Sequence, residues 1–412
     1  MKNSRLIFFP LSYPFSIGEE YSFINDEIKI LSSYFEKVLI YPTIIRGNQY
    51  DMPDNCEVKL EYAKSLSKTK NHSSVFNLFL GLTNLTFIRE YFNNKKHYNS
   101  FKKILTLIIY NYKLQKKVKW VEQNLTVRPN DIIYSFWFTN TTNSLTLAKN
   151  TRELNIVTRV HGIDLYENRS FNNIPFRKMS LDQINLIATI SEKGKDYLID
   201  KYPKIQDKIK CHYLGFSNIE NFFSETSRDG IFRVVSCSSV IPLKRVELIY
   251  MSLQKVAEKI KSKLEWTHIG GGDLLNELKQ NTLGESNLKI NFLGKITHEE
   301  IIDFYKNEPV DLFLHASETE GLPMVMIEAA SFGVPIISTN VGGVSEIVID
   351  GFNGYLVDGK GDVNEIASTV CEFFLLDKEE KLIIRNNGKK LYSNKFNSIN
   401  NAHFFAKTLI EL

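Results

Sequence analysis

The 412-residue sequence is poor in cysteine, proline and glycine, and these shortages argue against several classes of protein. Its 11 prolines and 21 glycines are too few for a collagen-like or low-complexity chain. The four cysteines, at positions 56, 211, 237 and 371, include no pair at metal-ligand or redox spacing. This argues against a zinc site or a disulfide scaffold and indicates the cytoplasm. The apolar run at 6–9 is cut by Pro10 and Pro14, too short for a signal sequence or a membrane span.

The length and the apolar pattern predict an α/β fold of two Rossmann-like domains facing each other across a cleft. A chain of 412 residues exceeds what one core organises. Short runs rich in β-branched and aromatic residues alternate with helix-length segments, as in parallel βα units. Predicted strands lie at 5–9, 37–41, 131–136, 156–160, 186–190, 210–214, 232–237, 264–269, 289–293, 310–315, 335–339 and 355–357. We expect an acceptor-binding domain at 1–215, a linker at 216–230, a nucleotide-binding domain at 231–395 and a C-terminal helix at 396–412 that packs back on the first domain.

The net charge of +4 hides an uneven distribution. Residues 64–119 hold twelve Lys and Arg and one acid, giving +11, so the rest of the chain carries −7. This asymmetry indicates an anionic partner, for which we consider a membrane surface, nucleic acid or simply a solvated helix face. Nucleic acid is the poorer interpretation, because no stacking-aromatic platform accompanies the charge. Interleaving with apolar residues favours a helix lying on an anionic membrane, with the cations Lys102, Lys103, Lys113, Lys116, Lys117 and Lys119.

The densest functional pattern runs from residue 316 to 328, between a predicted strand and a helix whose first residue is Pro323. Backbone N–H groups in the segment Gly321-Leu322-Pro323-Met324, with the helix dipole, make a site for a phosphate or a sugar hydroxyl. Glu320 in the loop and Glu328 in the helix can accept hydrogen bonds from both hydroxyls of a vicinal diol. The alternative is a helix start whose acids only complement the dipole.

Three further loops follow predicted strands in the second half. Lys244 and Arg245 could neutralise a diphosphate, although exposed Lys-Arg pairs are common. Gly270, Gly271 and Gly272 free the backbone for close approach to a ligand, but Leu275 stands where the dinucleotide fingerprint needs glycine. The third loop contains Gly342-Gly343 and Glu346.

Together these motifs resemble the family 4 retaining glycosyltransferases of GT-B fold. The resemblance covers residues 232–357, through Glu320-Gly321-Leu322-Pro323 with Glu328, then Gly333-x-Pro335, Gly342-Gly343-x-x-Glu346 and Gly351-x-x-Gly354. In the first half, the segments 159–166 and 189–194 resemble the acceptor domain of members that build bacterial capsules, exopolysaccharides and lipopolysaccharides. The opening segment 13–19, with Gly18 and Glu19, resembles theirs as well.

The resemblance implies transfer of a sugar from a nucleoside diphosphate sugar, with UDP or GDP, to a glycan or lipid-linked acceptor. It implies that Glu328 holds the ribose, Lys244 the diphosphate, and Glu320 with the following amides the donor sugar. His161 would approach that sugar from the other domain, although a lone histidine at a strand end is more often structural. Lys244 and the amides make metal and other cofactors unnecessary, since the chain has no Asp-x-Asp pair at the sheet edge. Catalytic roles thus fall to Glu320, His161 and Lys244, and the acceptor side to Gly18, Glu19, His161 and Asp164.

One departure from the family pattern leaves two functions open. Many members carry an arginine where this chain reads Ser238-Ser239-Val240, so Arg245 replaces it or donor affinity is lower. The second function is a catalytically silent GT-B subunit that binds a membrane or a partner glycosyltransferase. Glycoside hydrolysis needs two facing carboxylates, whereas Glu320 and Glu328 share one loop-helix element. Either way we expect a cytoplasmic protein, peripheral on the inner face of the membrane.

Overall fold

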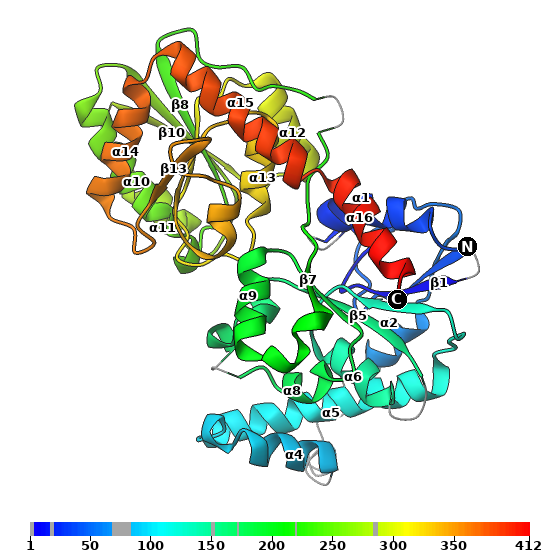
Figure 1. Ribbon diagram of the computed structural model, residues 1–412. Coiled ribbons are helices and arrows are strands. Elements are labelled where there is room, and N and C mark those ends of the chain that lie inside the picture. Colours follow the sequence, from blue (N-terminus) through cyan, green and yellow to red (C-terminus); the bar gives the residue numbers. More distant parts are fainter. Residues whose placement is uncertain are drawn as a thin grey trace. The chain divides into compact units, whose positions relative to one another are not determined.

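The computed structural model describes residues 4–16, 20–67, 84–149, 153–170, 173–218, 221–282 and 287–412. The chain divides into two compact units, Met1–His212 with Ala402–Leu412, and Tyr213–Asn401. Each unit contains one parallel sheet with helices packed on it (Figure 1). A strand is present at each of the twelve predicted places, and the predicted α/β class with two Rossmann-like domains is confirmed.

The sheet of the first unit has seven strands in the order β3-β2-β1-β4-β5-β6-β7, all parallel. The edge strand β3 was not predicted, because its three half-buried residues include too few apolar positions to form a run. The central strands are buried on both faces, as parallel strands between helices are. The strands are β1 Arg5–Phe9, β2 Lys37–Ile40, β3 Cys56–Val58, β4 Ile132–Ser135, β5 Asn155–Val160, β6 Leu186–Thr189 and β7 Ile209–Cys211.

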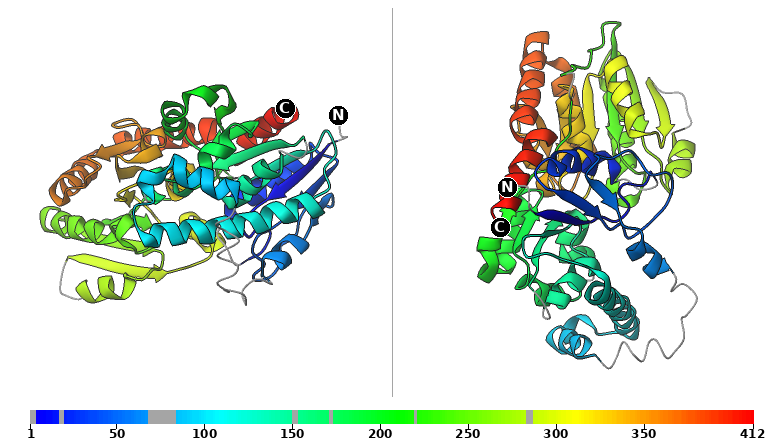
Figure 2. Two further views of the ribbon diagram at one scale, coloured as in Figure 1. Left: turned by 90° about the horizontal axis from the view of Figure 1, so that it is seen from below. Right: turned by 90° about the vertical axis from the view of Figure 1, so that its right-hand side faces the viewer.

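Helices of the first unit follow most of its strands. The longest, α5, begins after Ser100, whose hydroxyl caps the Lys103 amide at 3.4 Å. It packs between α4 and α6, and Figure 2 shows α4 and α5 side by side. The helices are α1 Tyr21–Ser32, α2 Glu61–Ser67, α4 Leu85–Asn93, α5 Phe101–Asn124, α6 Asn140–Ala148, α7 Gly162–Leu165, α8 Arg177–Leu181 and α9 Glu192–Lys201, with 3₁₀ turns at Lys95–His97, Glu167–Ser170 and Pro203–Lys208.

A buried charged network ties the core of this unit together. Arg159 on β5 is fully buried and pairs with Glu27 of α1 at 2.6 Å. The Tyr134 hydroxyl of β4 accepts from Arg159 at 2.8 Å and donates to Glu27 at 2.9 Å. The guanidinium also lies 4.5 Å from the ring of Phe405, in the C-terminal segment of the unit. Because each polar group has a partner, the network escapes the cost of an isolated buried charge.

The Tyr213–Asn401 unit has a six-stranded parallel sheet in the order β10-β9-β8-β11-β12-β13. Helices α10 and α14 pack together on one face, and Figure 1 shows α12 and α13 on the other. The strands are β8 Ile231–Cys237, β9 Lys263–Ile269, β10 Leu288–Gly294, β11 Leu312–His315, β12 Ile336–Thr339 and β13 Gly354–Val357. The helices are α10 Val246–Lys259, α11 Leu275–Asn281, α12 His298–Asn307, α13 Met324–Ser331, α14 Val363–Leu375 and α15 Lys378–Lys395, with 3₁₀ turns at Pro242–Lys244 and Gly342–Glu346.

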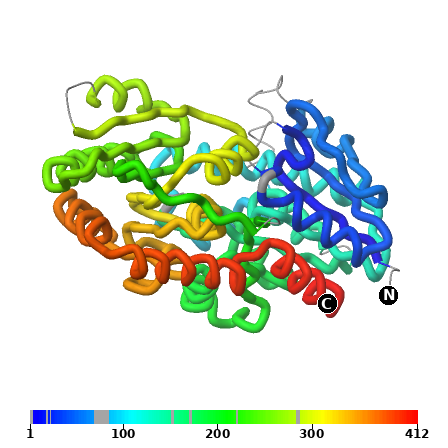
Figure 3. Tube along the Cα trace, turned by 90° about the horizontal axis from the view of Figure 1, so that it is seen from above, coloured from blue at the N-terminus to red at the C-terminus, as the bar shows by residue number. Residues whose placement is uncertain are grey.

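The chain ends in two consecutive helices, α15 and α16 (Ser398–Ile410), drawn red in Figure 3. α15 belongs to the Tyr213–Asn401 unit, while the segment from Ala402 onward belongs to the first unit. There the Nδ1 atom of His403 and the hydroxyl of Tyr34 form a hydrogen bond of 2.9 Å. The first unit is therefore assembled from both ends of the chain.

Candidate functional site

The second-half candidates lie in loops that follow the carboxyl ends of neighbouring strands. The loops after β8, β9, β11 and β12 carry, in that order, Lys244, the glycines 270–272, Glu320 and the glycines 342–343. Because these strands are adjacent and parallel, their carboxyl ends meet at one edge of the sheet. This is the edge at which open α/β sheets bind ligands.

The loop between β11 and α13 presents backbone N–H groups at this edge. α13 begins at Met324, so Pro323 is its N-cap residue and not its first helical residue as the sequence predicted, a shift of one position. Within the described part of the chain, the amides of Gly321, Leu322 and Met324 donate to no protein acceptor. They are therefore available to an anion or to a sugar hydroxyl.

Gly342 and Gly343 hold this loop from the neighbouring strand. The Gly343 amide donates to the Gly321 carbonyl at 2.9 Å. A Cβ atom on Gly342, which has a φ of +52°, would lie 1.9 Å from the carbonyl oxygen of Glu320. Only glycine permits such an approach at this φ, so the pair fixes the loop's position.

Glu320 is the centre of the charged cluster at this edge. Its Oε1 accepts from Lys244 Nζ at 2.5 Å and from His315 Nε2 at 2.9 Å. Burial alone would raise the pKa of the Glu320 carboxyl, but the hydrogen bond and charge of His315, with the charge of Lys244, outweigh it and lower that pKa to about 2. Glu320 is therefore ionised at every physiological pH. The sequence interpretation missed His315, although its place as the last residue of a buried strand marks it.

Lys244 is the last residue of the 3₁₀ turn that follows β8. Its turn is fastened to the Glu320 loop, because the Glu318 amide donates to the Leu243 carbonyl at 2.9 Å. The ammonium is partly exposed while it is paired with Glu320. It can therefore meet an incoming anion without leaving its carboxylate partner.

Arg245 has a different place from the one the sequence suggested. Its backbone is left-handed, with φ +47° and ψ +43°. Its guanidinium donates to the carbonyls of Ala316 at 2.6 Å, Ser317 at 2.7 Å and Gly359 at 3.0 Å, and also to that of Lys360. With its N–H groups committed to loop carbonyls, Arg245 ties three loops together and is poorly placed to replace the missing phosphate cation.

The glycines 270–272 pack against backbone. A Cβ on Gly270 would lie 1.9 Å from the Ser238 carbonyl oxygen, and one on Gly272 would lie 2.5 Å from that of Val240. Both have large positive φ values. A Cβ on Gly271 would make only an ordinary contact at 3.5 Å, with Lys295, so Gly271 is the member with room beside it.

Glu328 lies in α13 with its carboxylate almost wholly buried. Its Oε1 is 3.0 Å from Nε2 of His298, the first residue of α12. The structure thus adds His298, which the sequence interpretation did not consider. Its position just after the carboxyl end of β10 is the feature that could have identified it.

His161 and Asp164, in the first unit, follow β5. The Asp164 carboxylate accepts from the His161 amide at 2.5 Å and from the Phe138 amide at 2.7 Å, which is a capping role. The His161 ring is buried against Phe136 and Trp137, at centroid distances of 4.7 and 4.1 Å. Neither ring nitrogen has a hydrogen-bond partner in the described chain. The nearest charged group to the ring is Asp164, whose Oδ2 lies 3.9 Å from His161 Nδ1.

Gly18 and Glu19 lie outside the described residues. The next residue, Glu20, is buried and was not among the candidates. Its carboxylate accepts from the amides of Leu11, Ser12 and Tyr13, and from the indole N–H of Trp137. Glu20 therefore shapes the loop after β1 next to the ring that flanks His161.

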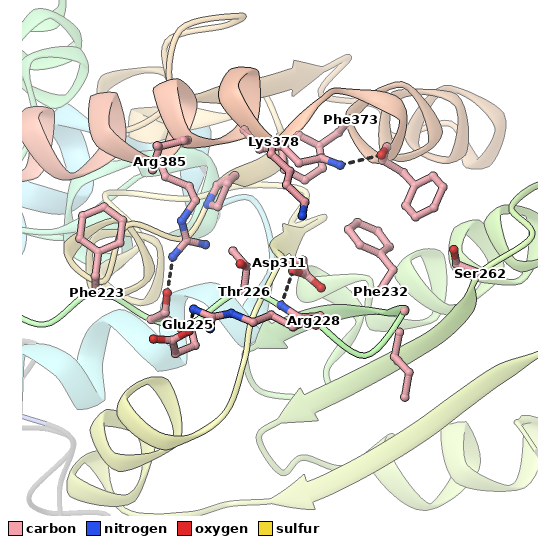
Figure 4. A pocket seen from close by; sticks show the side chains of 18 residues that line it. Phe223, Glu225, Thr226, Arg228, Phe232, Ser262, Asp311, Phe373, Lys378 and Arg385 are labelled. Carbon is pink, nitrogen blue, oxygen red and sulfur yellow. Dashed lines mark hydrogen bonds and ion pairs between the residues drawn. The ribbon is translucent and has the colours of Figure 1, made fainter.

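A cavity of about 720 Å³ lies elsewhere on the Tyr213–Asn401 unit (Figure 4). Its lining includes the starts of β8, β11 and β12, so it faces the amino edge of the sheet and not the Lys244–Glu320 edge. Arg385 donates there to the carbonyl of Ser224, and Asp311 accepts from the Ser227 amide at 2.9 Å (Figure 4). These polar groups fasten the 223–230 segment to the unit and do not converge on a ligand.

Within the described ranges no three His, Cys, Asp or Glu side chains come together as metal ligands do. Among the same residues no helix has both the length and the apolar content needed to cross a membrane. None of the four cysteines forms a disulfide.

Comparison with known proteins identifies relatives of the chain. Residues 217–391 match the family described as glycosyl transferases group 1. The capsular polysaccharide biosynthesis glycosyltransferase CapM of Staphylococcus aureus is 38% identical over 97 residues, 24% of each chain. An Escherichia coli UDP-Gal:alpha-D-GlcNAc-diphosphoundecaprenol alpha-1,3-galactosyltransferase is 30% identical over 132 residues, 32% of this chain and 33% of that one. Among four curated relatives the matched part covers 24% to 66% of their length, so it falls short of two thirds of each.

Solved structures share the fold over nearly the whole chain. The crystal structure of Anabaena HepE with UDP and glucose matches with a TM-score of 0.63 at 18% identity, covering 99% of both chains. At this identity the match concerns the fold, which confirms the GT-B class expected from the motifs.

Proposed function

We propose that the chain, whose residues 217–391 match the glycosyl transferases group 1 family, transfers a sugar from a nucleoside diphosphate sugar to a glycan or lipid-linked acceptor with retention of configuration. The observation that carries the proposal is the cluster of Lys244, Glu320 and His315 beside the free amides of Gly321 and Leu322. A cation and N–H donors at one sheet edge suit a diphosphate, and a carboxylate suits sugar hydroxyls.

For the donor, we assign the ribose to Glu328, the diphosphate to Lys244 and the sugar to Glu320 with the amides after it. The burial of Glu328 supports its role, because a carboxylate out of water makes strong hydrogen bonds to a diol. Gly271 leaves room for close approach of a ligand beside it. The E. coli relative, whose name contains UDP-Gal, supports UDP as the nucleotide, with GDP as the alternative.

For the chemistry, the leaving diphosphate accepts the proton of the attacking hydroxyl. Lys244 and the amides neutralise the charge that develops on the diphosphate, so catalysis rests on positioning and electrostatics. The same groups make a metal ion unnecessary in this proposal. On the family resemblance we also assign His161 to the donor sugar; its ring is buried against Phe136 and Trp137.

For the pathway, we propose bacterial surface polysaccharide biosynthesis. The name of CapM concerns a capsule, and that of the E. coli relative concerns a sugar on diphosphoundecaprenol. Both fit an acceptor that is a growing glycan or its lipid-linked form.

A second candidate, a catalytically silent GT-B subunit, is favoured by one observation. Ser239 stands where many members have an arginine, and the Arg245 guanidinium is engaged by four carbonyls. Incubating the purified protein with nucleotide sugars separates the candidates, since an active enzyme slowly hydrolyses its donor and a silent subunit releases no nucleoside diphosphate.

The donor is found with a panel of nucleotide sugars scored by thermal shift. A donor present at 100 times its dissociation constant stabilises the protein by ~2.7 kcal/mol, which is readily measured. The anomeric configuration of the product, read by NMR, then tests retention. An inverted product, or a panel with no stabilising nucleotide sugar, would overturn the proposal.

A further inference from the structure

The charged segment 84–119 forms the helices α4 and α5, and their packing differs from the sequence expectation. The apolar residues of α5 do not form a free face, because Leu107, Leu114 and Val118 are buried in a cluster with Phe87 of α4. Lys117, expected on the outer surface, is buried and donates to Asn140 Oδ1 at 2.7 Å and Thr141 Oγ1 at 2.6 Å. The expectation for Lys117 was wrong, and the interleaving on α5 is an ordinary buried helix face.

The exposed apolar side chains of this segment lie mainly on α4 and at the start of α5. Leu85, Ile88 and Phe92 are 70%, 40% and 66% exposed, and Phe101 at the start of α5 is 81% exposed. The spacing i, i+3, i+7 aligns the three α4 residues along one side of the helix, while Phe87 on another side is buried. Phe101, Leu85 and Phe92 are three of the four most exposed large apolar side chains among the described residues of the first unit. We name Leu85, Ile88 and Phe92 the α4 stripe.

Exposed cations share the segment 84–119 with the α4 stripe, and no exposed acid does. The only acid in residues 84–119 is Glu90. It is buried, where its carboxylate accepts from the Tyr98 hydroxyl at 2.8 Å and from Asn94 at 3.1 Å. The exposed charge of residues 84–119 is therefore positive. It comes from Arg89, Lys95, Lys96, Lys102, Lys113 and Lys119.

We propose that the α4 stripe and the exposed cations of residues 84–119 dock the protein on an anionic lipid surface, with α4 lying in the plane of the interface. The apolar side chains enter the boundary between headgroups and acyl chains, and the cations meet the lipid phosphates. Charge complementarity favours this occupant over a second copy of the chain, because two copies would bring the same positive surfaces together. Each cation near such a surface strengthens binding roughly fivefold. This inference is independent of the proposed transferase activity.

Co-sedimentation of the full-length protein with vesicles tests the proposal. We expect binding to vesicles of phosphatidylcholine with phosphatidylglycerol, loss of binding as salt approaches 1 M, and little binding to phosphatidylcholine alone. Replacing the α4 stripe with L85S, I88S and F92S should weaken binding at least tenfold. Leu85 and Phe92 are mostly exposed and Ile88 is partly exposed, so the protein should stay folded with a slightly lower melting temperature. The matched control is L375S, L382S and I383S, three exposed apolar residues of the other unit, which should bind like the native protein.

Two further measurements separate insertion from simple charge attraction. The cation variant K95Q, K96Q and K102Q should bind anionic vesicles more weakly than the native protein. At low salt it should still bind to some extent, because its α4 stripe is intact. With Phe92→Trp, the emission of the introduced tryptophan should shift to the blue and be quenched by brominated acyl chains. Native protein that ignores anionic vesicles, or a stripe variant that binds equally well, would overturn the proposal. A stripe variant that instead converts a dimer to a monomer would assign the surface to a second copy.

Discussion

Replacing Glu328 tests the donor assignment most directly. The carboxylate is buried in α13, and its Oε1 is held 3.0 Å from His298 Nε2. A ribose diol bound to this carboxylate would make charge-assisted hydrogen bonds worth ~1.5 to 3 kcal/mol. Since 1.4 kcal/mol corresponds to a factor of ten, we expect Glu328→Ala to weaken nucleoside diphosphate binding by about 10- to 150-fold.

Isothermal titration with UDP and GDP measures this change, using whichever nucleotide binds the native protein. Glu328→Gln keeps the shape of the side chain but loses the charge, so its loss should be smaller than that of Glu328→Ala. His298→Ala should cost less still, because His298 orients the carboxylate and does not itself contact the ribose in this proposal. Glu372→Gln, at an exposed acid of α14, is the matched control and should bind normally.

The nucleoside alone provides the decisive comparison. Because the ribose is common to nucleoside and diphosphate, Glu328→Ala should weaken both by the same factor. An unchanged dissociation constant in a variant that melts at the native temperature would refute the reasoning. So would a loss confined to the diphosphate, which would move Glu328 to the phosphate site.

Three other outcomes are expected. Lys244→Ala should weaken a nucleoside diphosphate by about 10- to 150-fold and leave the nucleoside unaffected, since it removes one charge-assisted contact; an equal loss for both ligands in titrations would contradict the assignment. Transfer should persist in EDTA, because Lys244 and the loop amides neutralise the diphosphate; complete loss restored by Mg²⁺ or Mn²⁺ would show a metal requirement. Burial, with the charge of Lys113, lowers the pKa of Lys117 to about 7 from 10.5. The unfolded chain then binds the extra proton between these values, so the unfolding free energy should rise with pH from 7 to 10.5, by up to ~1.4 kcal/mol per pH unit. Denaturant titrations at pH 7 and 9 should show this rise in the native protein and lose it in Lys117→Met, and an equal slope in both proteins would place the titration elsewhere.

Much of the fold follows from local patterns in the sequence. Each of the twelve predicted apolar runs contains a strand, and the central strands are buried because helices cover both faces of a parallel sheet. The motif around Glu320 was predicted to follow a strand and start a helix, and it does. The strand β3 escaped notice because three half-buried residues leave no periodicity to detect. The strands and the strand-loop-helix motif could therefore be predicted from neighbouring residues in the sequence.

Side-chain partners, by contrast, were decided by tertiary structure. The sequence offered Arg245 as a free cation and Lys117 as a surface cation, but the structure engages one with loop carbonyls and buries the other. It also places His315 next to Glu320 and His298 next to Glu328. It buries much of the apolar side of α5 and leaves the α4 stripe exposed. The periodicity of a helical sequence predicts that one side of the helix is apolar. Whether other elements pack on that side depends on segments distant in the chain. Contacts of this kind form only when strands and helices far apart in sequence pack, so no window of neighbouring residues encodes them.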